Sequence, residues 1–251
     1  MDIVQEFYDN LAPQYENLFD DWRKETFYQG VMLLGILRKY GIDPPKTVLD
    51  CACGIGTQAL GISRFTFDVI GSDISEVSLE KARRIAKIFK CPVTFQKADF
   101  RKLSDTFKQK FDIIIAMDNA LPHMLTEEDM EMAIASITDR LNDDGVFVAS
   151  IRDYDEILKT KPPYSPPYIY GREGNRQISF QTWDWKGDRY KLTQYIINDE
   201  DTLEISKYNC EYRAVKREEI TNLFYKYGYS KVDWLFPKYT NFYQPIVIAK
   251  K

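Results

Sequence analysis

The chain has 251 residues, of which 44% are hydrophobic and 29% charged, and its formal net charge is −4. This length and composition suit one large globular domain, or one domain that carries an insertion. No apolar run approaches the roughly 20 residues of a membrane span, the first residues lack the features of a signal peptide, and no long basic run offers a broad surface to nucleic acid. We therefore expect a cytoplasmic protein whose partners are small molecules, with neither nucleic acid nor membrane among them.

Metal ligands are scarce in this sequence. It has four cysteines without a CxxC pair and a single histidine, so the usual ligand sets for zinc are missing. We expect no metal site.

The first 45 residues precede the first predicted strand and show the apolar spacing of helices. One helical stretch is interrupted at Pro13, and a second runs from Trp22 to Tyr40. Two helices before the first strand are unusual in a dehydrogenase.

The stretch 47–63, TVLDCACGIGTQALGIS, predicts a buried strand, a glycine-rich turn and a helix. Gly54 and Gly56 lack a Cβ, so the backbone can turn sharply there and a ligand can approach it closely. The same turn also fits the dinucleotide fingerprint, since Ala59 can stand for its last glycine. Asp50 favours a different ligand, because its carboxylate would repel a pyrophosphate, whereas S-adenosylmethionine carries an ammonium and a sulfonium group.

The segment LDCACGIGTQAL resembles the first motif of class I S-adenosylmethionine-dependent methyltransferases, an acid followed by alternating glycines. Ala52 stands where the first glycine is common. The segment FYDNLAPQYENLFDDW resembles the amino-terminal segment that covers the cofactor in many small-molecule methyltransferases. This resemblance implies that Tyr15, Trp22 and Arg23 lie over the cofactor; the alternative is that the aromatic rings only dock the helices onto the sheet.

Two further predicted strands end at acidic residues that suit a nucleoside. Residues 67–71 form the second strand, and Asp73 follows at its carboxyl end, where a carboxylate can accept hydrogen bonds from both ribose hydroxyls. The third strand, 93–96, leads to the tripeptide ADF over 98–100, a position that the family uses for adenine. The alternative for this tripeptide is a surface turn with its aromatic ring in the core.

The fourth and fifth predicted strands cover 111–117 and 146–151. The fourth is followed by DNALPH over 118–123, and the fifth is followed directly by Arg152. Ligands of open parallel sheets lie outside the carboxyl ends of the strands, so these residues face the transferred methyl group.

After Arg152 the pattern changes to an antiparallel meander. Four prolines lie within 161–168, and strand-like runs follow over 177–185, 190–198 and 202–213. A helix over 217–227 and two strands, 231–236 and 244–249, then return to the main sheet as an antiparallel pair at its edge.

The predicted fold is therefore α/β, a doubly wound, Rossmann-like methyltransferase sheet of seven strands with an antiparallel β insertion that forms a lid. We expect an N-terminal helical cap over 1–45, the Rossmann-like domain over 46–153 and 214–251, and the substrate lid over 154–213.

The segments DNALPHM and LNDDGVFVASIRDYDEIL resemble the paired segments of glycine N-methyltransferase and its bacterial glycine and sarcosine relatives. This resemblance implies an acceptor site with Asn119 and His123 from the first segment and Arg152 from the second. Asp118 stands where that group commonly has glycine, which crowds and charges the acceptor pocket. His123 has a structural alternative, in which it only holds the loop.

We expect the acceptor to be a small, amino-acid-like amine. Its carboxylate would pair with the planar guanidinium of Arg152 while its nitrogen attacks the sulfonium methyl group in line. Tyr170, Tyr195 and Tyr212 from the insertion would close the pocket around it.

Three classes of function fit the sequence: a methyltransferase acting on a small N- or O-acceptor, a nicotinamide-dependent oxidoreductase, and a non-catalytic protein that binds S-adenosylmethionine. Our hypothesis is the first, with S-adenosylmethionine as the cofactor; the oligomeric state, a homodimer included, is left open. Arg152 also has an alternative role, an ion pair with Asp153 or Asp155 that pins the lid. The residues expected to bind the cofactor are Tyr15, Trp22, Arg23, Asp50, Cys51, Ala52, Gly54, Gly56, Asp73, Ile74, Ala98, Asp99, Phe100 and Met117.

Overall fold

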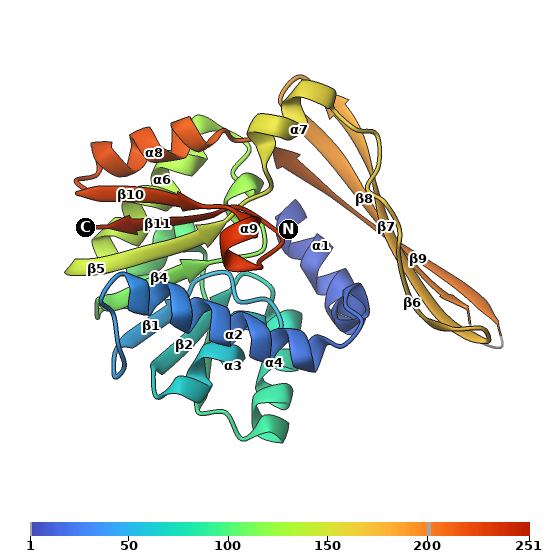
Figure 1. Ribbon diagram of the computed structural model, residues 1–251, viewed down its shortest axis with the longest axis horizontal. Helices are drawn as coiled ribbons and strands as arrows, with labels where there is room; N and C mark the ends of the chain where they lie inside the picture. The colour runs from blue at the N-terminus through green and yellow to red at the C-terminus, as the bar shows by residue number, and fades with distance from the viewer. Residues whose placement is uncertain (1, 200–201) are drawn as a thin grey trace.

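The computed structural model describes residues 2–199 and 202–251, which form two β-sheets and the helices that cover them (Figure 1). Within these residues the main sheet has seven strands in the order β10-β11-β5-β4-β1-β2-β3. They are β1 (Thr47–Asp50), β2 (Asp68–Asp73), β3 (Val93–Lys97), β4 (Phe111–Ala116), β5 (Leu141–Ser150), β10 (Lys231–Leu235) and β11 (Ile246–Lys250). Neighbouring strands are parallel except at β11, which runs antiparallel to both β5 and β10. The predicted α/β fold and its antiparallel edge pair are confirmed.

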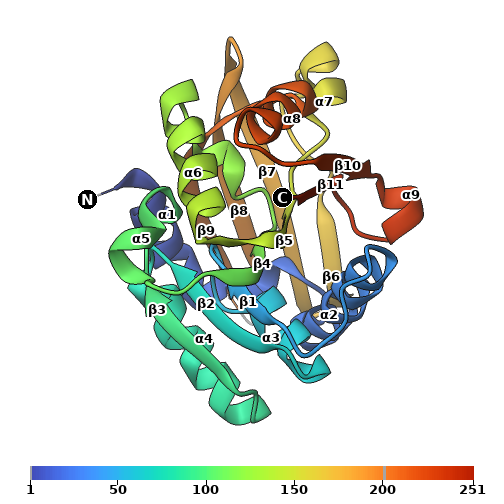
Figure 2. The same ribbon diagram turned by 90° about the vertical axis from the view of Figure 1, so that its left-hand side faces the viewer.

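Helices cover both faces of the main sheet, as Figure 2 shows for α2 and α6. One face carries α2 (Trp22–Lys39), α3 (Thr57–Ile62) and α4 (Glu76–Phe89), and the other carries α5 (Leu103–Thr106), α6 (Glu127–Arg140) and α8 (Arg217–Lys226). Successive strand residues feed the two cores in turn, because side chains alternate across a sheet: Val48 packs on the first face and Leu49 on the second. The strands are buried on both sides, so their carboxyl ends are held firmly in place.

The remaining helical segments connect these layers. They are α1 (Ile3–Leu11), η1 (Ala12–Leu18), η2 (Ser63–Phe65), η3 (Phe100–Lys102), η4 (Leu121–His123), α7 (Tyr154–Thr160) and α9 (Pro237–Thr240). In the part of the chain that the structure describes, no helix is both long and apolar enough to cross a membrane.

A four-stranded sheet, called here the lid sheet, projects from the main domain among the described residues (Figure 1). Its strands β6 (Tyr168–Arg172), β7 (Asn175–Lys186), β8 (Arg189–Asp199) and β9 (Leu203–Arg213) each pair antiparallel with the next. In Figure 1, α1 and η1 lie between the two sheets, and Gln14 Nε2 donates to Ser206 Oγ at 3.2 Å. The N-terminal segment therefore contacts the lid sheet as well as the main domain.

Three elements differ from the predicted pattern. β5 begins at Leu141 rather than at residue 146, because Leu141 still pairs with Phe111 before the register shifts. A helix, α7, stands where the insertion was expected to begin, and acidic residues in its first turn suit the helix dipole. β6 is an additional strand, whose pattern is obscured by the prolines before it and by Gly171, which has φ 78°.

Candidate active site

A cavity opens at the carboxyl ends of β1, β2, β3 and β4, beneath α1 and η1. Twelve of the residues singled out in the sequence line it: Tyr15, Cys51, Ala52, Gly54, Asp73, Ile74, Asp99, Phe100, Met117, Asp118, Ala120 and His123. The sheet thus brings together side chains that are distant in the chain, as expected where parallel strands end at one edge.

The glycine turn is fixed by the acid at the end of the next strand. Gly54 and Gly56 adopt φ values of 52° and 95°, which suit glycine. Asp73 accepts hydrogen bonds from the backbone amides of Gly54 at 2.8 Å and Ser75 at 2.9 Å. Ala52 is not among the residues with positive φ, so alanine fits at the position where glycine is common.

Asp50 is a fully buried carboxylate at the end of β1. Neither of its oxygens accepts a hydrogen bond from the described residues. Burial raises its pKa well above the ordinary value, opposed only in part by the nearby amides of Ala52 and Ala59, and Asp73 and Asp118 raise it further. An unpaired buried carboxylate is costly, and a cationic ligand such as the ammonium group of S-adenosylmethionine would offset that cost.

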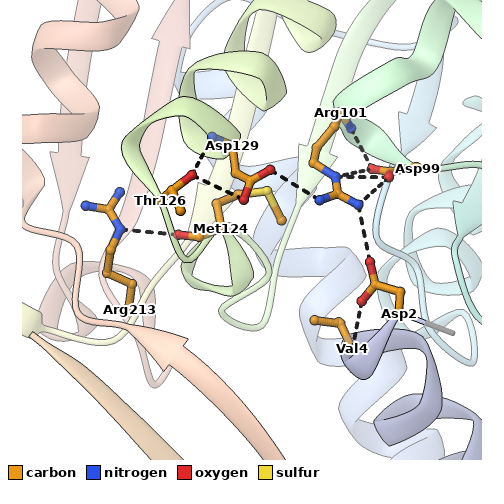
Figure 3. A network of polar contacts seen from close by, with 8 residues as sticks. All are labelled: Asp2, Val4, Asp99, Arg101, Met124, Thr126, Asp129 and Arg213. Atoms are coloured by element: carbon orange, nitrogen blue, oxygen red, sulfur yellow. Dashed lines mark hydrogen bonds and ion pairs between the residues drawn. The ribbon is translucent and has the colours of Figure 1, made fainter. Parts of the chain in front are cut away.

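Arg101 connects the end of the cavity at Asp99 to Asp2 near the start of α1 (Figure 3). Its guanidinium binds Asp99 at 2.7 Å, Asp2 at 3.2 Å and Asp129 at 3.3 Å. Asp2 also caps α1, since its Oδ1 accepts a hydrogen bond from the amide of Val4 at 2.8 Å. One arginine therefore joins the start of α1 to η3 and α6.

Trp22 and Arg23 do not line this cavity, unlike Tyr15. Trp22 is buried, and its ring N–H donates to Thr57 Oγ1 at 2.9 Å, so it supports a lining residue instead. Arg23 lines a separate surface groove, with its guanidinium 5.6 Å from the Phe89 ring centre. The expectation that Arg23 covers the cofactor is not supported, because α2 turns its side chain toward α4.

Three further expected residues, Gly56, Asp50 and Ala98, are not among those that line the cavity. Gly56 is the residue before α3, and its carbonyl accepts a hydrogen bond from the amide of Leu60 at 2.9 Å. The amide of Ala98 donates a hydrogen bond to the carbonyl of Asp73 at 3.1 Å. Gly56 and Ala98 therefore shape the cavity through their backbone.

The acceptor side of the site begins with two residues in the left-handed region, Asp118 with φ 55° and Asn119 with φ 70°. Their amides donate to Ser150, the first to its hydroxyl at 2.8 Å and the second to its carbonyl at 3.1 Å. Asn119 Oδ1 accepts a hydrogen bond from the backbone amide of Arg152 at 3.0 Å, and Asn119 Nδ2 donates one to Tyr154 Oη at 3.0 Å. Asn119 therefore joins the ends of β4 and β5 and does not itself line the cavity.

Arg152 is surrounded by neutral groups of the lid sheet. Its guanidinium donates to Tyr190 Oη at 2.6 Å and to Gln181 Oε1 at 2.9 Å, and lies 5.2 and 5.4 Å from the ring centres of Trp183 and Tyr212. No carboxylate is within ion-pair distance of it in the described ranges.

The alternative ion pair of Arg152 is not present. Asp153 and Asp155 both pair with Arg217 instead. These ion pairs therefore join α7 to α8, and Arg152, which is not among the residues that line the cavity, has no oppositely charged partner in the described ranges.

His123 lies between the N-terminal helix and the lid sheet. Its Nε2 is 2.9 Å from Tyr8 Oη, its Nδ1 is 3.5 Å from Cys210 Sγ, and its ring centre is 4.2 Å from that of Tyr212. Burial and the charge of Arg152 lower the pKa of His123 to about 3, so the ring is neutral at ordinary pH. Burial raises the pKa of Tyr8, Tyr15 and Tyr212, so their hydroxyls remain protonated.

None of the three expected tyrosines, Tyr170, Tyr195 and Tyr212, is among the residues that line the cavity. Tyr170 points its hydroxyl at the carbonyl of Leu18, 3.5 Å away. Tyr195 stacks on Phe180 at 4.9 Å, on the face of β8 opposite to Tyr190, because their positions differ by an odd number of residues. Of the three, Tyr212 alone packs against both His123 and Arg152.

Several lining residues are absent from the expected set: Asp2, Val4, Tyr8, Cys53, Thr57, Gln58, Arg101 and Met124. Thr57 and Gln58 follow the glycine turn directly and are the ones that a sequence pattern can suggest. Tyr8 and Asp2 belong to the cavity only because α1 folds across it, which spacing along the chain does not reveal.

Comparison with known proteins gives consistent results. Residues 48–145 match the family described as a methyltransferase domain. The glycine/sarcosine N-methyltransferase of Halorhodospira halochloris is 25% identical over 92% of this chain and 81% of that protein. The glycine/sarcosine/dimethylglycine N-methyltransferase of Actinopolyspora halophila is 24% identical over 92% of this chain but only 39% of its own length. Among solved structures, DesVI of Streptomyces venezuelae has the same fold, with a TM-score of 0.75 and 19% identity over 94% of both chains.

Proposed function

Since the chain is a class I S-adenosylmethionine-dependent methyltransferase, we propose that its acceptor is the amine of a small amino acid, glycine- or sarcosine-like in kind, whose carboxylate binds Arg152. The names of the two relatives support this choice of acceptor. Both are distant relatives, so the proposal rests mainly on the residues of this chain.

The observation that carries the proposal is the unpaired charge of Arg152. A guanidinium has five N–H donors, and the protein engages two of its nitrogens through Tyr190 and Gln181. The remaining donors suit a planar carboxylate, which binds a guanidinium by two parallel hydrogen bonds. Trp183 and Tyr212 flank the group and would shield such a pair from water.

The cofactor residues follow from the same geometry. Asp50 and Gly54 would hold the methionine part, Asp73 the ribose, and Asp99 with Phe100 the adenine. When bound, S-adenosylmethionine supplies an electrophilic methyl group on a positively charged sulfur. The protein's task is then to align the amine and exclude water, because the sulfur leaves as a neutral thioether without needing a proton. Tyr8 and Tyr15 provide protonated hydroxyls and ring faces to the cavity, and Tyr212 packs against the His123 ring that also lines it.

Turnover with a panel of acceptors tests the proposal. The purified protein is incubated with S-adenosylmethionine and glycine, sarcosine, N,N-dimethylglycine, methylamine or ethanolamine, and S-adenosylhomocysteine is measured. We expect methylation of at least one of the amino acids, and much slower reaction with methylamine and ethanolamine, which lack the carboxylate. Equal rates with and without a carboxylate would refute the proposed acceptor class.

Arg152→Lys separates a binding role from a structural one. Lysine keeps the charge but loses the planar fork, so the acceptor KM should rise at least tenfold while the affinity for S-adenosylmethionine changes less than threefold. The exposed Arg176 on the lid sheet provides a matched control, Arg176→Lys, which should leave both quantities unchanged. Equal loss of both affinities in Arg152→Lys would make the arginine structural.

A further inference from the structure

Asp118 is an acid held in an unfavourable backbone conformation beside the candidate acceptor site. Its φ of 55° lies in the left-handed region, and the next residue shares that conformation. Such backbone strain tends to persist where function requires it. The side chain lines the cavity and is fixed on both oxygens: Gln58 Nε2 donates to Oδ2 at 2.8 Å and Tyr243 Oη donates to Oδ1 at 2.6 Å.

The protein supplies no positive charge to this carboxylate. In the described ranges no lysine or arginine lies within ion-pair distance of it, and Arg101, the one arginine lining the cavity among these residues, is bound to three other carboxylates. His123 is neutral. The groups that face Asp118 are the neutral Gln58, Tyr15 and Tyr243 together with acids. Burial raises the pKa of Asp118, Glu25 raises it further, and Asp50 is close enough to be affected by Asp118.

The position of Asp118 separates it from the cofactor acids. Asp50 ends β1 and Asp73 ends β2, whereas Asp118 follows β4, the strand beside β5 that leads to Arg152. Asn119, the next residue, bonds directly to the Arg152 backbone. Asp118 and Arg152 thus follow adjacent strands at one edge of the sheet, and their charges have the two signs that a zwitterionic ligand requires.

We propose that Asp118 binds the ammonium group of the acceptor and takes its proton, so that the protein selects acceptors that arrive as cations. This inference rests on the proposed function, which it extends from the carboxylate of the acceptor to its nitrogen. Gln58 and Tyr243 are positioning residues that hold the carboxylate toward the cavity.

The chemistry explains why an acid is useful there. Aliphatic amines have pKa values near that of lysine, about 10.4, so roughly one molecule in two thousand is unprotonated at pH 7. The ammonium group transfers one proton to the Asp118 carboxylate, which becomes a neutral acid. The freed nitrogen lone pair forms a bond to the methyl carbon while the carbon–sulfur bond breaks and its electron pair remains on sulfur. The products are a methylated ammonium ion and the neutral thioether, and release of the Asp118 proton to water restores the carboxylate.

Two variants test this role. Asp118→Asn keeps the shape of the side chain, and Asp118→Gly suits the left-handed backbone. We expect both to lower kcat/KM for the amino acid that the wild type methylates by 10²–10³-fold at pH 7, in the range typical of proton transfer by a positioned side chain. The deficit should shrink about tenfold per pH unit as the solution itself deprotonates the amine. Asp68→Asn, an exposed acid at the opposite end of β2, is the matched control and should retain wild-type activity.

Binding measurements give a readout that does not depend on turnover. Calorimetry on the complex with S-adenosylhomocysteine uses two fragments as probes, methylammonium and acetate. Asp118→Asn should weaken methylammonium binding at least tenfold and leave acetate unchanged, whereas Arg152→Lys should do the reverse. Affinity for S-adenosylhomocysteine within threefold of wild type shows that the variants are folded.

The outcomes separate this inference from the proposed function. A wild type that methylates no amine in the panel overturns the proposed function, and the role of Asp118 with it. A wild type that is active, with Asp118 variants that retain its kcat/KM or lose the same factor at every pH, overturns the role of Asp118 alone.

Discussion

Asp50, Asp118 and Arg152 are charged side chains to which the described protein offers no opposite charge. Groups of this kind destabilise the folded protein unless a ligand compensates them. Their signs match those of the proposed ligands, two acids for ammonium groups and one guanidinium for a carboxylate. At the scale of single residues, the site is therefore defined by three charged side chains that have no oppositely charged partner among the described residues.

The first prediction concerns Asp50. Its folded pKa is raised, so the folded form retains its proton to higher pH than the unfolded form does. The resulting loss of stability begins as pH rises above the unfolded value of about 3.9 and grows until the folded pKa is passed. Asp50→Asn should therefore be more stable than the wild type at pH 7 without cofactor, and equal to it at pH 4. Each kcal/mol gained in the free energy of unfolding should raise Tm by roughly 2–4 °C.

The same variant should bind S-adenosylmethionine at least tenfold more weakly, because the buried negative charge that attracts the ammonium group of the cofactor is lost. Thermal unfolding at both pH values, with and without S-adenosylmethionine, measures the two effects together. Unchanged cofactor affinity would remove Asp50 from the site.

The second prediction concerns His123. Its pKa is lowered to about 3 in the folded protein, so the unfolded form binds the proton more readily and stability falls as pH drops below 6.5. At pH 5 this loss is about 2 kcal/mol relative to pH 7. Urea unfolding should show the loss in the wild type and not in His123→Gln, which can still accept the hydrogen bond of Tyr8. A step near pH 6.5 in the pH profile of kcat/KM would show instead that the ring titrates during turnover.

At the scale of elements, the N-terminal segment covers the cavity, and Arg101 holds this segment in place. The three ion pairs of this arginine join α1, η3 and α6 (Figure 3). Without them, the carboxylates of Asp2, Asp99 and Asp129 would face one another with no positive charge between them.

The third prediction is that Arg101→Met weakens the attachment of α1 to the rest of the protein. Backbone amides of α1 should exchange with deuterium at least tenfold faster, and affinity for S-adenosylmethionine should fall about tenfold, because several partly buried ion pairs are lost together. Arg84→Met, which removes an exposed pair with Glu80, is the control and should change neither quantity. Unaltered exchange in α1 would mean that the helix is held by its apolar face alone.

The strands, the glycine turn and the acids at the strand ends could be predicted from the sequence, because burial on both faces and carboxyl-end placement leave local patterns. Asp73 and Asp99 illustrate this. Trp22, Arg23 and Tyr195 could not be located in the same way, since their directions depend on how α2 and β8 are rotated in the folded chain. Tyr8 and Arg101 reach the cavity through contacts between distant segments, and those contacts leave no local pattern.

At the scale of the whole molecule, the two sheets contribute different parts of the site. The main sheet presents the acids at its carboxyl edge, and the lid sheet surrounds Arg152 with Gln181, Trp183, Tyr190 and Tyr212. The N-terminal segment contacts both. A methyl donor on the main sheet and an acceptor under the lid would meet where Asp118 and His123 line the cavity.

A crystal structure with S-adenosylhomocysteine and sarcosine tests this arrangement most directly. We predict the sarcosine carboxylate at about 2.7–2.9 Å from the Arg152 guanidinium, with its nitrogen between Asp118 and the cofactor sulfur. Sarcosine bound elsewhere, or a guanidinium that still contacts only Tyr190 and Gln181 while the acceptor is in the cavity, would contradict the account.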